Sequence, residues 1–184
     1  MRHPNLAGKS DSLLVIVDMQ ETLLRAVLNR QEITSNCKKL AGTAKILNLP
    51  VLVTEQNPEK LLGTAAEILE ILPPHNMVGK LDFSCCGSQD FIRHLEATGR
   101  KTVILCGVEA HICVSQTAHD LIARGYRVHV PEDAVSSRRE LDRQAGIKKM
   151  QLAGAIPTSA EAVIYELLGC AGTDQFRQVL KMVK

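Results

Sequence analysis

Short, unbroken aliphatic runs alternate with amphipathic segments along this chain, and this alternation is the strongest constraint on its fold. Residues 13–17 read LLVIV and residues 102–106 read TVILC. Runs of this length without an interrupting charge are typical of parallel strands that are buried on both faces. Between them apolar residues recur at helical spacing, as over residues 32–47. The pattern predicts βαβ units and a parallel sheet covered by helices on both faces.

The same patterns divide the rest of the chain into elements. Strands are expected at residues 13–17, 51–54, 76–80, 102–106, 127–130 and 155–158. Helices are expected at residues 32–47, 64–72, 87–98, 113–123, 141–152, 159–168 and 173–183. We predict an α/β, Rossmann-like protein with a mainly parallel six-stranded sheet in the order 3-2-1-4-5-6. Neither G-x-G-x-x-G nor a P-loop follows the first strand, which argues against dinucleotide and phosphate binding.

Length, charge and hydropathy limit the class of protein. With 184 residues, 45% of them hydrophobic, the chain is expected to form one domain over residues 1–184. Its net charge is +2 without a basic stripe, which argues against a nucleic-acid partner. The apolar runs are far shorter than the roughly 20 residues of a membrane helix, and the N-terminal MRHPNLAGKSDS lacks the apolar centre of a signal peptide. We therefore expect a cytoplasmic protein without a membrane partner.

The six cysteines are thinly spread, as expected for free thiols in a reducing compartment. There is no C-x-x-C and no histidine pair at zinc-binding spacing, so metal and redox sites have little support. Cys113 differs from the others because it follows a strand and a turn at the point where a helix is expected to begin. The remaining cysteines are interpreted as small buried hydrophobes, namely Cys37, Cys85, Cys86, Cys106 and Cys170.

Three reactive side chains follow apolar strands. Asp18 ends the first run, Lys80 ends the third and Cys113 lies just beyond the fourth. Ligands of open parallel sheets bind outside the carboxyl ends of the strands, where the strand order reverses. A cation and a helix N-terminus both stabilise a thiolate, and a carboxylate can accept the thiol proton. The three residues together therefore predict a cysteine nucleophile with a base and a supporting cation.

Taken singly, each of these residues has a simpler structural interpretation. An aspartate after a strand is commonly a cap or turn residue, a lone lysine is commonly exposed, and a lone cysteine is commonly a buried thiol. His111 could form a competing Cys-His pair with Cys113. Side chains two residues apart in a turn seldom point to the same place, however, so we interpret His111 as a residue that lines the pocket or packs beside it. The shared location of Asp18, Lys80 and Cys113 favours the catalytic interpretation.

The motifs around these residues resemble one known family. VDMQ after the first strand, GKLDFSC around Lys80 and GVEAHICV around Cys113 are similar to the isochorismatase-like cysteine hydrolases. TEQNPEKLLGT, DLIARGYRVHVPEDAVSSR and AGAIPTSAEAVIYELLG extend the likeness over nearly the whole chain. Together they resemble the subgroup of isochorismatase domain-containing proteins.

The resemblance implies a three-layer αβα sandwich and a catalytic triad. In it Asp18 is the base, Lys80 supports the charge and Cys113 is the nucleophile. It also implies a cis peptide bond between Val108 and Glu109, and an oxyanion site formed by the backbone N–H groups of Glu109 and Cys113. The expected reaction is hydrolysis of a small amide or related carbonyl compound through a thioester. The substrate itself is not apparent from the sequence.

The chain departs from the family in one informative place. Nicotinamidases carry an Asp and His cluster for a metal after the second strand, whereas this chain has Glu55, Gln56, Asn57 and Pro58 there. We therefore expect no metal and no cofactor. Isochorismatase proper does not use the cysteine, so Cys113 argues against the reaction that gives the family its name.

Other expectations concern the pocket and the assembly. The chain has three Phe, two Tyr and no Trp, so an aromatic pocket would need a second subunit, and the family usually forms homo-oligomers. We expect Cys113 to react with iodoacetamide before the other five thiols. The residues expected to line a pocket for a small-molecule substrate are Leu23, Leu24, Gln56, Phe83 and His111.

Two other functions remain open from the sequence. One is a non-hydrolytic binding or scaffold protein that retains the pocket, which an intact triad without turnover would indicate. The other is a thiol redox protein that pairs Cys113 with Cys85, Cys86 or Cys106, which a disulfide formed under mild oxidation would indicate.

Overall fold

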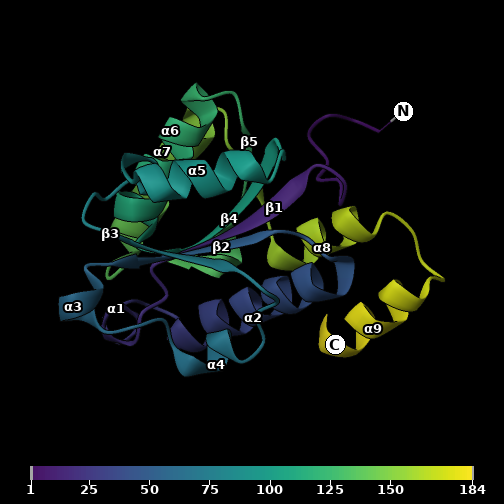
Figure 1. The fold of residues 1–184 in the computed structure, drawn as a ribbon, viewed down its shortest axis with the longest axis horizontal. Coiled ribbons are helices and arrows are strands. Elements are labelled where there is room, and N and C mark those ends of the chain that lie inside the picture. Colours follow the sequence, from purple (N-terminus) through teal and green to yellow (C-terminus); the bar gives the residue numbers. More distant parts are fainter. Residues whose placement is uncertain (1, 184) are drawn as a thin grey trace.

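The computed structural model describes residues 2–183 as a central sheet between two layers of helices (Figure 1). The strands are β1 (Ser12–Val17), β2 (Val51–Gln56), β3 (Asn76–Lys80), β4 (Thr102–Val108), β5 (Arg127–Pro131), β6 (Val135–Ser136) and β7 (Ile156–Thr158). The helices are α1 (Glu21–Leu24), α2 (Arg30–Leu47), α3 (Pro58–Leu61), α4 (Ala66–Leu69), α5 (Gln89–Ala97), α6 (Ser115–Ala123), α7 (Glu140–Leu152), α8 (Ala160–Leu168) and α9 (Asp174–Val183). Short helical turns are η1 (Cys85–Gly87), η2 (Ala110–Val114) and η3 (Glu132–Ala134).

The strand order confirms the predicted fold class. The strands pair in parallel in the order β3-β2-β1-β4-β5-β7, which is the predicted order with β7 as the last strand. The predicted count of six strands is one too low, because β6 pairs with residues 107–108 of β4 in a 7-stranded sheet. A strand of two residues is too short to show a hydrophobic period, so it could not be predicted from the sequence.

The sheet separates two hydrophobic cores. Leu14 and Ile16 of β1 pack on the side of α2 and α8, whereas Leu13 and Val15 pack on the side of α5, α6 and α7. Because successive side chains of a strand point to opposite faces, a strand covered on both faces needs apolar residues at every position. This explains the unbroken aliphatic run. Figure 1 shows α5, α6 and α7 on one side of the sheet and α2, α4, α8 and α9 on the other.

Several helix boundaries differ from those predicted. Ser88 accepts a hydrogen bond from Phe91 N, so this N-cap starts α5 at Gln89 rather than at residue 87. Ser159 caps α8 as expected by accepting from Ala162 N. The predicted helix 64–72 is reduced to Ala66–Leu69. The helix predicted from residue 113 is divided, because a π-helical turn covers Ala110–Val114 and α6 itself begins at Ser115.

Candidate active site

Asp18 lies where β1 ends, between β2 and β4 at the carboxyl edge of the sheet. Its backbone is left-handed, with φ 51°, a conformation that aspartate tolerates better than most residues. The side chain is fully buried, and Thr54 Oγ1 donates a hydrogen bond of 2.7 Å to its Oδ1 atom. The neighbouring strand approaches closely, since a Cβ on Gly107 would lie 2.0 Å from the Val17 carbonyl oxygen. Asp18 is therefore held in a tightly packed strand end.

Lys80 ends β3, two strands away from Asp18, and its side chain reaches back across β2. Its Nζ donates to Asp18 Oδ2 at 2.7 Å, to Gln56 Oε1 at 2.7 Å and to the Phe83 carbonyl oxygen at 3.4 Å. Neither side chain of the Lys80–Asp18 ion pair has any exposed surface. Burial is the largest single influence on the pKa of Lys80 and would lower it, but Asp18, Cys85 and Cys113 together outweigh burial, so the pKa is raised. Lys80 is a buried ammonium whose three protons all have acceptors.

Cys113 lies within the π-helical turn before α6 and is 6% exposed. Its Sγ atom is 4.0 Å from Gln56 Oε1. Burial and the Asp18 carboxylate raise the pKa of the thiol to about 12, although the Lys80 ammonium acts in the opposite direction. The raised pKa favours a protonated thiol beside the Asp18 carboxylate, which is the arrangement in which Asp18 can accept the thiol proton.

The exposure of the thiols bears on the expected order of labelling, in which Cys113 reacts first. Cys170 is exposed, whereas the other five thiols are buried. Alkylation needs both access and thiolate, and Cys113 offers little of either in this conformation. Iodoacetamide is therefore expected to reach Cys170 first.

The turn between β4 and α6 is anchored at several points. The Val108–Glu109 peptide bond is cis. Glu109 Oε2 accepts from Arg138 N at 3.0 Å and from Arg138 Nε at 3.1 Å. Helix α7 packs directly against the turn, because a Cβ on Gly146 would lie 2.7 Å from the Ala110 carbonyl oxygen. These contacts fix the backbone on which Cys113 is carried.

The five expected pocket residues fall in different places. Gln56 contacts both Lys80 and Cys113, and Phe83 approaches Lys80 through its carbonyl oxygen. The His111 Nδ1 atom lies 2.9 Å from Ser137 Oγ, away from the triad contacts. Leu24 packs into the core on the α2 side and has no exposed surface to offer a ligand, whereas Leu23 is only half-buried against that core and its place in a pocket stays a prediction.

Three contributors to the site were missed from the sequence. Thr54 bonds Asp18, and the Cys85 thiol lies 3.6 Å from Thr54 Oγ1. Burial raises the pKa of Cys85 to about 11. Gln20 is fully buried; its Oε1 accepts from Gln56 N at 2.7 Å and its Nε2 donates to the Gln56 carbonyl oxygen at 3.0 Å. The available signal was that VDMQ and VTEQ each carry a polar residue at the end of a neighbouring strand.

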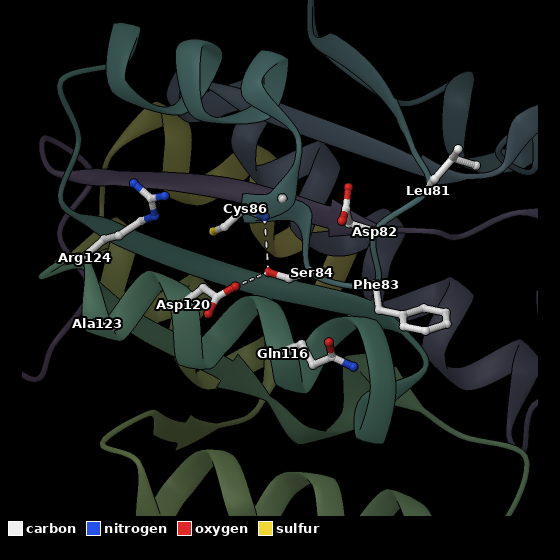
Figure 2. Close-up of a pocket in the computed structure, with 10 residues that line it drawn as sticks. Leu81, Asp82, Phe83, Ser84, Cys86, Gln116, Asp120, Ala123 and Arg124 are labelled. Atoms are coloured by element: carbon white, nitrogen blue, oxygen red, sulfur yellow. Dashed lines mark hydrogen bonds between the residues drawn. The ribbon is translucent and has the colours of Figure 1, made fainter.

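A groove of about 820 Å³ lies between α6 and the segment that follows Lys80, and its lining includes none of Asp18, Lys80 and Cys113. Figure 2 shows Phe83 and Leu81 toward one end and Arg124 toward the other, with Ser84 and Asp120 between them. Ser84 Oγ donates to Asp120 Oδ2 at 2.6 Å, which ties the two walls together. The segment that forms one wall thus also supplies the Phe83 carbonyl oxygen to Lys80.

Two further features concern metals and membranes. Over residues 2–183, no group of three or more His, Cys, Asp and Glu side chains is arranged to hold a metal ion. In the same part of the chain, no helix has both the length and the apolar character needed to cross a membrane.

Comparison with known proteins gives consistent matches over the length of the chain. A model of the isochorismatase domain matches residues 12–162. Isochorismatase domain-containing protein 2 of Xenopus laevis is 33% identical over 184 residues, which are 100% of this chain and 88% of that protein.

Two solved structures share the fold closely. One is described as the MAR1 ribonuclease of Caenorhabditis elegans, with a TM-score of 0.92 and 37% identity over 97% of this chain and 92% of that one. The other is the YcaC product of Escherichia coli, described as an octameric hydrolase of unknown specificity. It has a TM-score of 0.88 and 25% identity over 100% of this chain and 89% of that one.

Proposed function

The chain belongs to the isochorismatase family, whose fold supports a hydrolytic role, and we propose that it is a cysteine-dependent hydrolase of a small amide or related carbonyl compound. In this proposal Cys113 is the nucleophile, Asp18 the base and Lys80 the supporting cation. The reaction passes through a thioester on Cys113.

The observation that carries the proposal is the fully buried Asp18–Lys80 ion pair beside a thiol. Removing two charges from water costs more than their attraction commonly returns, so a buried pair is poor evidence for a role in stability. Perturbed titratable groups gathered at a strand end are typical of active sites. Lys80 also interacts electrostatically with Cys113, which links the pair to the nucleophile.

The pKa of Cys113 determines the order of the first steps. Because the thiol is protonated at neutral pH, the sulfur becomes a nucleophile only when Asp18 accepts its proton. The C–S bond then forms as the carbonyl π bond opens to an oxyanion. The proton on Asp18 passes to the leaving nitrogen, the C–N bond breaks, and an amine or ammonia departs.

The second half of the reaction returns the enzyme to its starting state. Asp18 takes a proton from water, the hydroxide adds to the thioester carbonyl, and the C–S bond breaks. The sulfur recovers the proton, and a carboxylic acid leaves. Lys80 keeps its charge throughout, and its ammonium balances the negative charge that moves between Asp18 and Cys113.

We assign stabilisation of the oxyanion to the backbone N–H groups of Glu109 and Cys113. Preorganised backbone donors are among the largest contributors to acyl-transfer catalysis, because they need no reorganisation during the reaction. The anchoring of the turn by Arg138 and by α7 supports this role.

The decisive experiment compares Cys113→Ala with Cys170→Ala on a panel of small amides. We expect Cys113→Ala to keep the fold and to lose about 10³-fold or more in kcat/KM, whereas Cys170→Ala, on the exposed cysteine, keeps the wild-type rate. An aldehyde analogue of the best substrate should add to Cys113 as a hemithioacetal, detected by mass spectrometry. Equal turnover by both variants would exclude the cysteine mechanism.

The scaffold alternative makes a different prediction for the same panel. Wild-type protein would then bind amides without turnover and would hold a protein partner tightly. Because one related structure is described as a ribonuclease, RNA belongs in the panel. If the wild type cleaves RNA and Cys113→Ala does not, the substrate would be RNA rather than a small amide, and Cys113 would still be the nucleophile.

Assembly and location are also proposals for this chain. The octameric description of the related YcaC structure supports a homo-oligomer, which light scattering on the purified protein would test. We propose a cytoplasmic location and no nucleic-acid or membrane partner, in line with the even spread of charge. Imaging of the tagged chain and a vesicle-binding assay would test these proposals.

A further inference from the structure

We propose that Gln56 recognises the leaving nitrogen of the substrate, so that the site selects amides with at least one N–H group over tertiary amides and esters. The inference rests on the proposed function and specifies its substrate class. Gln56 would be a specificity-determining residue that contacts the reacting group.

The contacts of Gln56 place one oxygen at the centre of the site. Gln56 Oε1 accepts from Lys80 Nζ at 2.7 Å and lies 4.0 Å from Cys113 Sγ. A lysine ammonium can only donate, so the side-chain atom that faces it must be the amide oxygen. The orientation of this amide is therefore fixed by chemistry as well as by the coordinates.

Gln56 is held rigidly in that orientation. Its Nε2 atom donates to the Leu81 carbonyl oxygen at 2.8 Å. Its backbone N–H and carbonyl are both bonded by the buried side chain of Gln20. A side chain fixed at both ends loses little entropy when it binds a substrate, which is how preorganised specificity groups act.

The position of Oε1 decides which substrate group can lie against it. In a reactive complex the carbonyl carbon lies about 3–3.5 Å from the attacking sulfur. The substituents of that carbon then come within hydrogen-bonding reach of an acceptor 4.0 Å from the same Sγ atom. The developing oxyanion is excluded from this position, because two acceptor oxygens would face each other. An amide N–H fits the position, whereas an ester oxygen or a dialkylated nitrogen has no proton to donate.

The hydrogen bond also changes strength during the reaction. As the nitrogen takes the proton that Asp18 removed from Cys113, it becomes positively charged, and its hydrogen bond to Gln56 becomes charge-assisted. Interactions that strengthen in the transition state raise kcat rather than lowering KM. The contribution of Gln56 should therefore appear mainly in kcat.

The test uses three substrates with the same acyl group, namely a primary amide, its N,N-dimethyl amide and its methyl ester. The variants are Gln56→Leu, which removes the acceptor, and Gln56→Glu, which keeps one. Loss of the Lys80 contact will lower all rates of Gln56→Leu, so the ratio of amide to ester kcat/KM is the informative quantity. We expect Gln56→Leu to lower that ratio about 10-fold or more, mainly through kcat, and Gln56→Glu to lower it less.

Two outcomes would overturn the assignment. In one, the amide-to-ester ratio of kcat/KM in Gln56→Leu stays within about twofold of the wild-type ratio while both rates fall. Gln56 would then only position Lys80 and would not recognise the substrate. In the other, wild-type protein hydrolyses the dimethyl amide as fast as the primary amide. The Cys113→Ala variant separates these results from the proposed function: if it retains hydrolysis of both substrates, the thioester mechanism fails whatever Gln56 does. Circular dichroism of each variant confirms that the fold is intact.

Discussion

At the scale of single residues, the site depends on where one proton resides. A thiol with a pKa raised to about 12 favours the protonated form at neutral pH, so in the proposed mechanism its reactivity depends on proton transfer to Asp18. This arrangement protects the sulfur from adventitious alkylation and oxidation, which require a thiolate. In the proposed mechanism, the sulfur becomes a nucleophile only when Asp18 accepts its proton.

The rate of alkylation reports how much of the Cys113 thiol is ionised and accessible. With iodoacetamide at pH 7, we expect Cys170 to be modified first and Cys113 slowly, because Cys170 is exposed and Cys113 is 6% exposed. The rate at Cys113 should rise about tenfold per pH unit from pH 7 to 10, since thiolate forms in that proportion well below the pKa. Peptide mass spectrometry of timed samples gives both rates. A plateau for Cys113 below pH 8 would contradict the raised pKa.

The ion pair provides a second prediction for single residues. Lys80→Met leaves Asp18 buried without its cation and should cost about 3–5 kcal/mol in the free energy of unfolding. The double variant Asp18→Asn, Lys80→Met removes both charges and should recover most of that loss, while both variants remain inactive. Urea denaturation gives the free energies. A double variant no more stable than Lys80→Met would show that the buried charge is not the cause.

At the scale of elements, the sequence predicted the strands well and the turns poorly. The run over residues 13–17 is buried at every position, and burial is what the aliphatic pattern reports. The two-residue β6 and the π-helical turn of Cys113 left no such pattern. Their positions depend on close packing, such as that of Gly146 against the Ala110 carbonyl oxygen, and a single sequence does not display tertiary contacts.

The same limit applies to the site. Asp18, Lys80 and Cys113 could be predicted as candidates because reactive residues at strand ends stand out against apolar surroundings. Thr54 and Gln20 were missed because a threonine in a strand and a glutamine in a turn are ordinary residues. Their roles come from the register that pairs Val17 with Thr54, which places the next residue, Asp18, beside the hydroxyl.

The close approach of β1 and β4 at Gly107 leads to a prediction about stability. Its φ is 121°, and a Cβ there would lie 2.0 Å from the Val17 carbonyl oxygen. Gly99 also has positive φ, at 65°, but nothing lies within 4 Å of a Cβ added to it. We expect Gly99→Ala to cost about 1–2 kcal/mol through backbone strain alone. Gly107→Ala should cost clearly more, because β1 and β4 must separate, and activity should be lost with it.

Thermal unfolding of the two glycine variants makes the comparison. Similar midpoints for Gly99→Ala and Gly107→Ala would show that β4 tolerates a side chain beside Val17. A fully folded Gly107→Ala protein with wild-type activity would contradict the packing that positions Asp18.

At the scale of the whole molecule, one buried histidine couples stability to pH. His129 of β5 has no exposed surface, and neither ring nitrogen has a hydrogen-bond partner. Burial lowers the pKa of His129, although the Glu166 carboxylate 3.9 Å away acts in the opposite direction. The unfolded chain therefore binds a proton at a pH where the folded chain does not.

The sign of the effect follows from this difference. Below the unfolded pKa of about 6.5, the unfolded state holds more protons, so the free energy of unfolding falls as the pH falls. His129→Leu should make the free energy of unfolding depend less on pH between pH 6.5 and 5. The control variant His94→Leu, on α5, should keep a steeper dependence than His129→Leu. Denaturant titrations at several pH values supply the slopes. An unchanged slope in His129→Leu would assign the acid sensitivity to other groups.

The buried side chain of Gln20 has a consequence for the whole sheet. Its amide accepts from the backbone N–H of Gln56 and donates to the carbonyl oxygen of the same residue, so it satisfies both groups that a neighbouring strand would otherwise pair. The side chain thus imitates one more residue of β1 after the main chain has turned away at Asp18. Both backbone groups of Gln56 therefore keep their hydrogen bonds while the backbone of Asp18 turns its carboxylate inward. Gln20 thus extends the hydrogen bonding of β1 beyond the point where its main chain leaves the sheet.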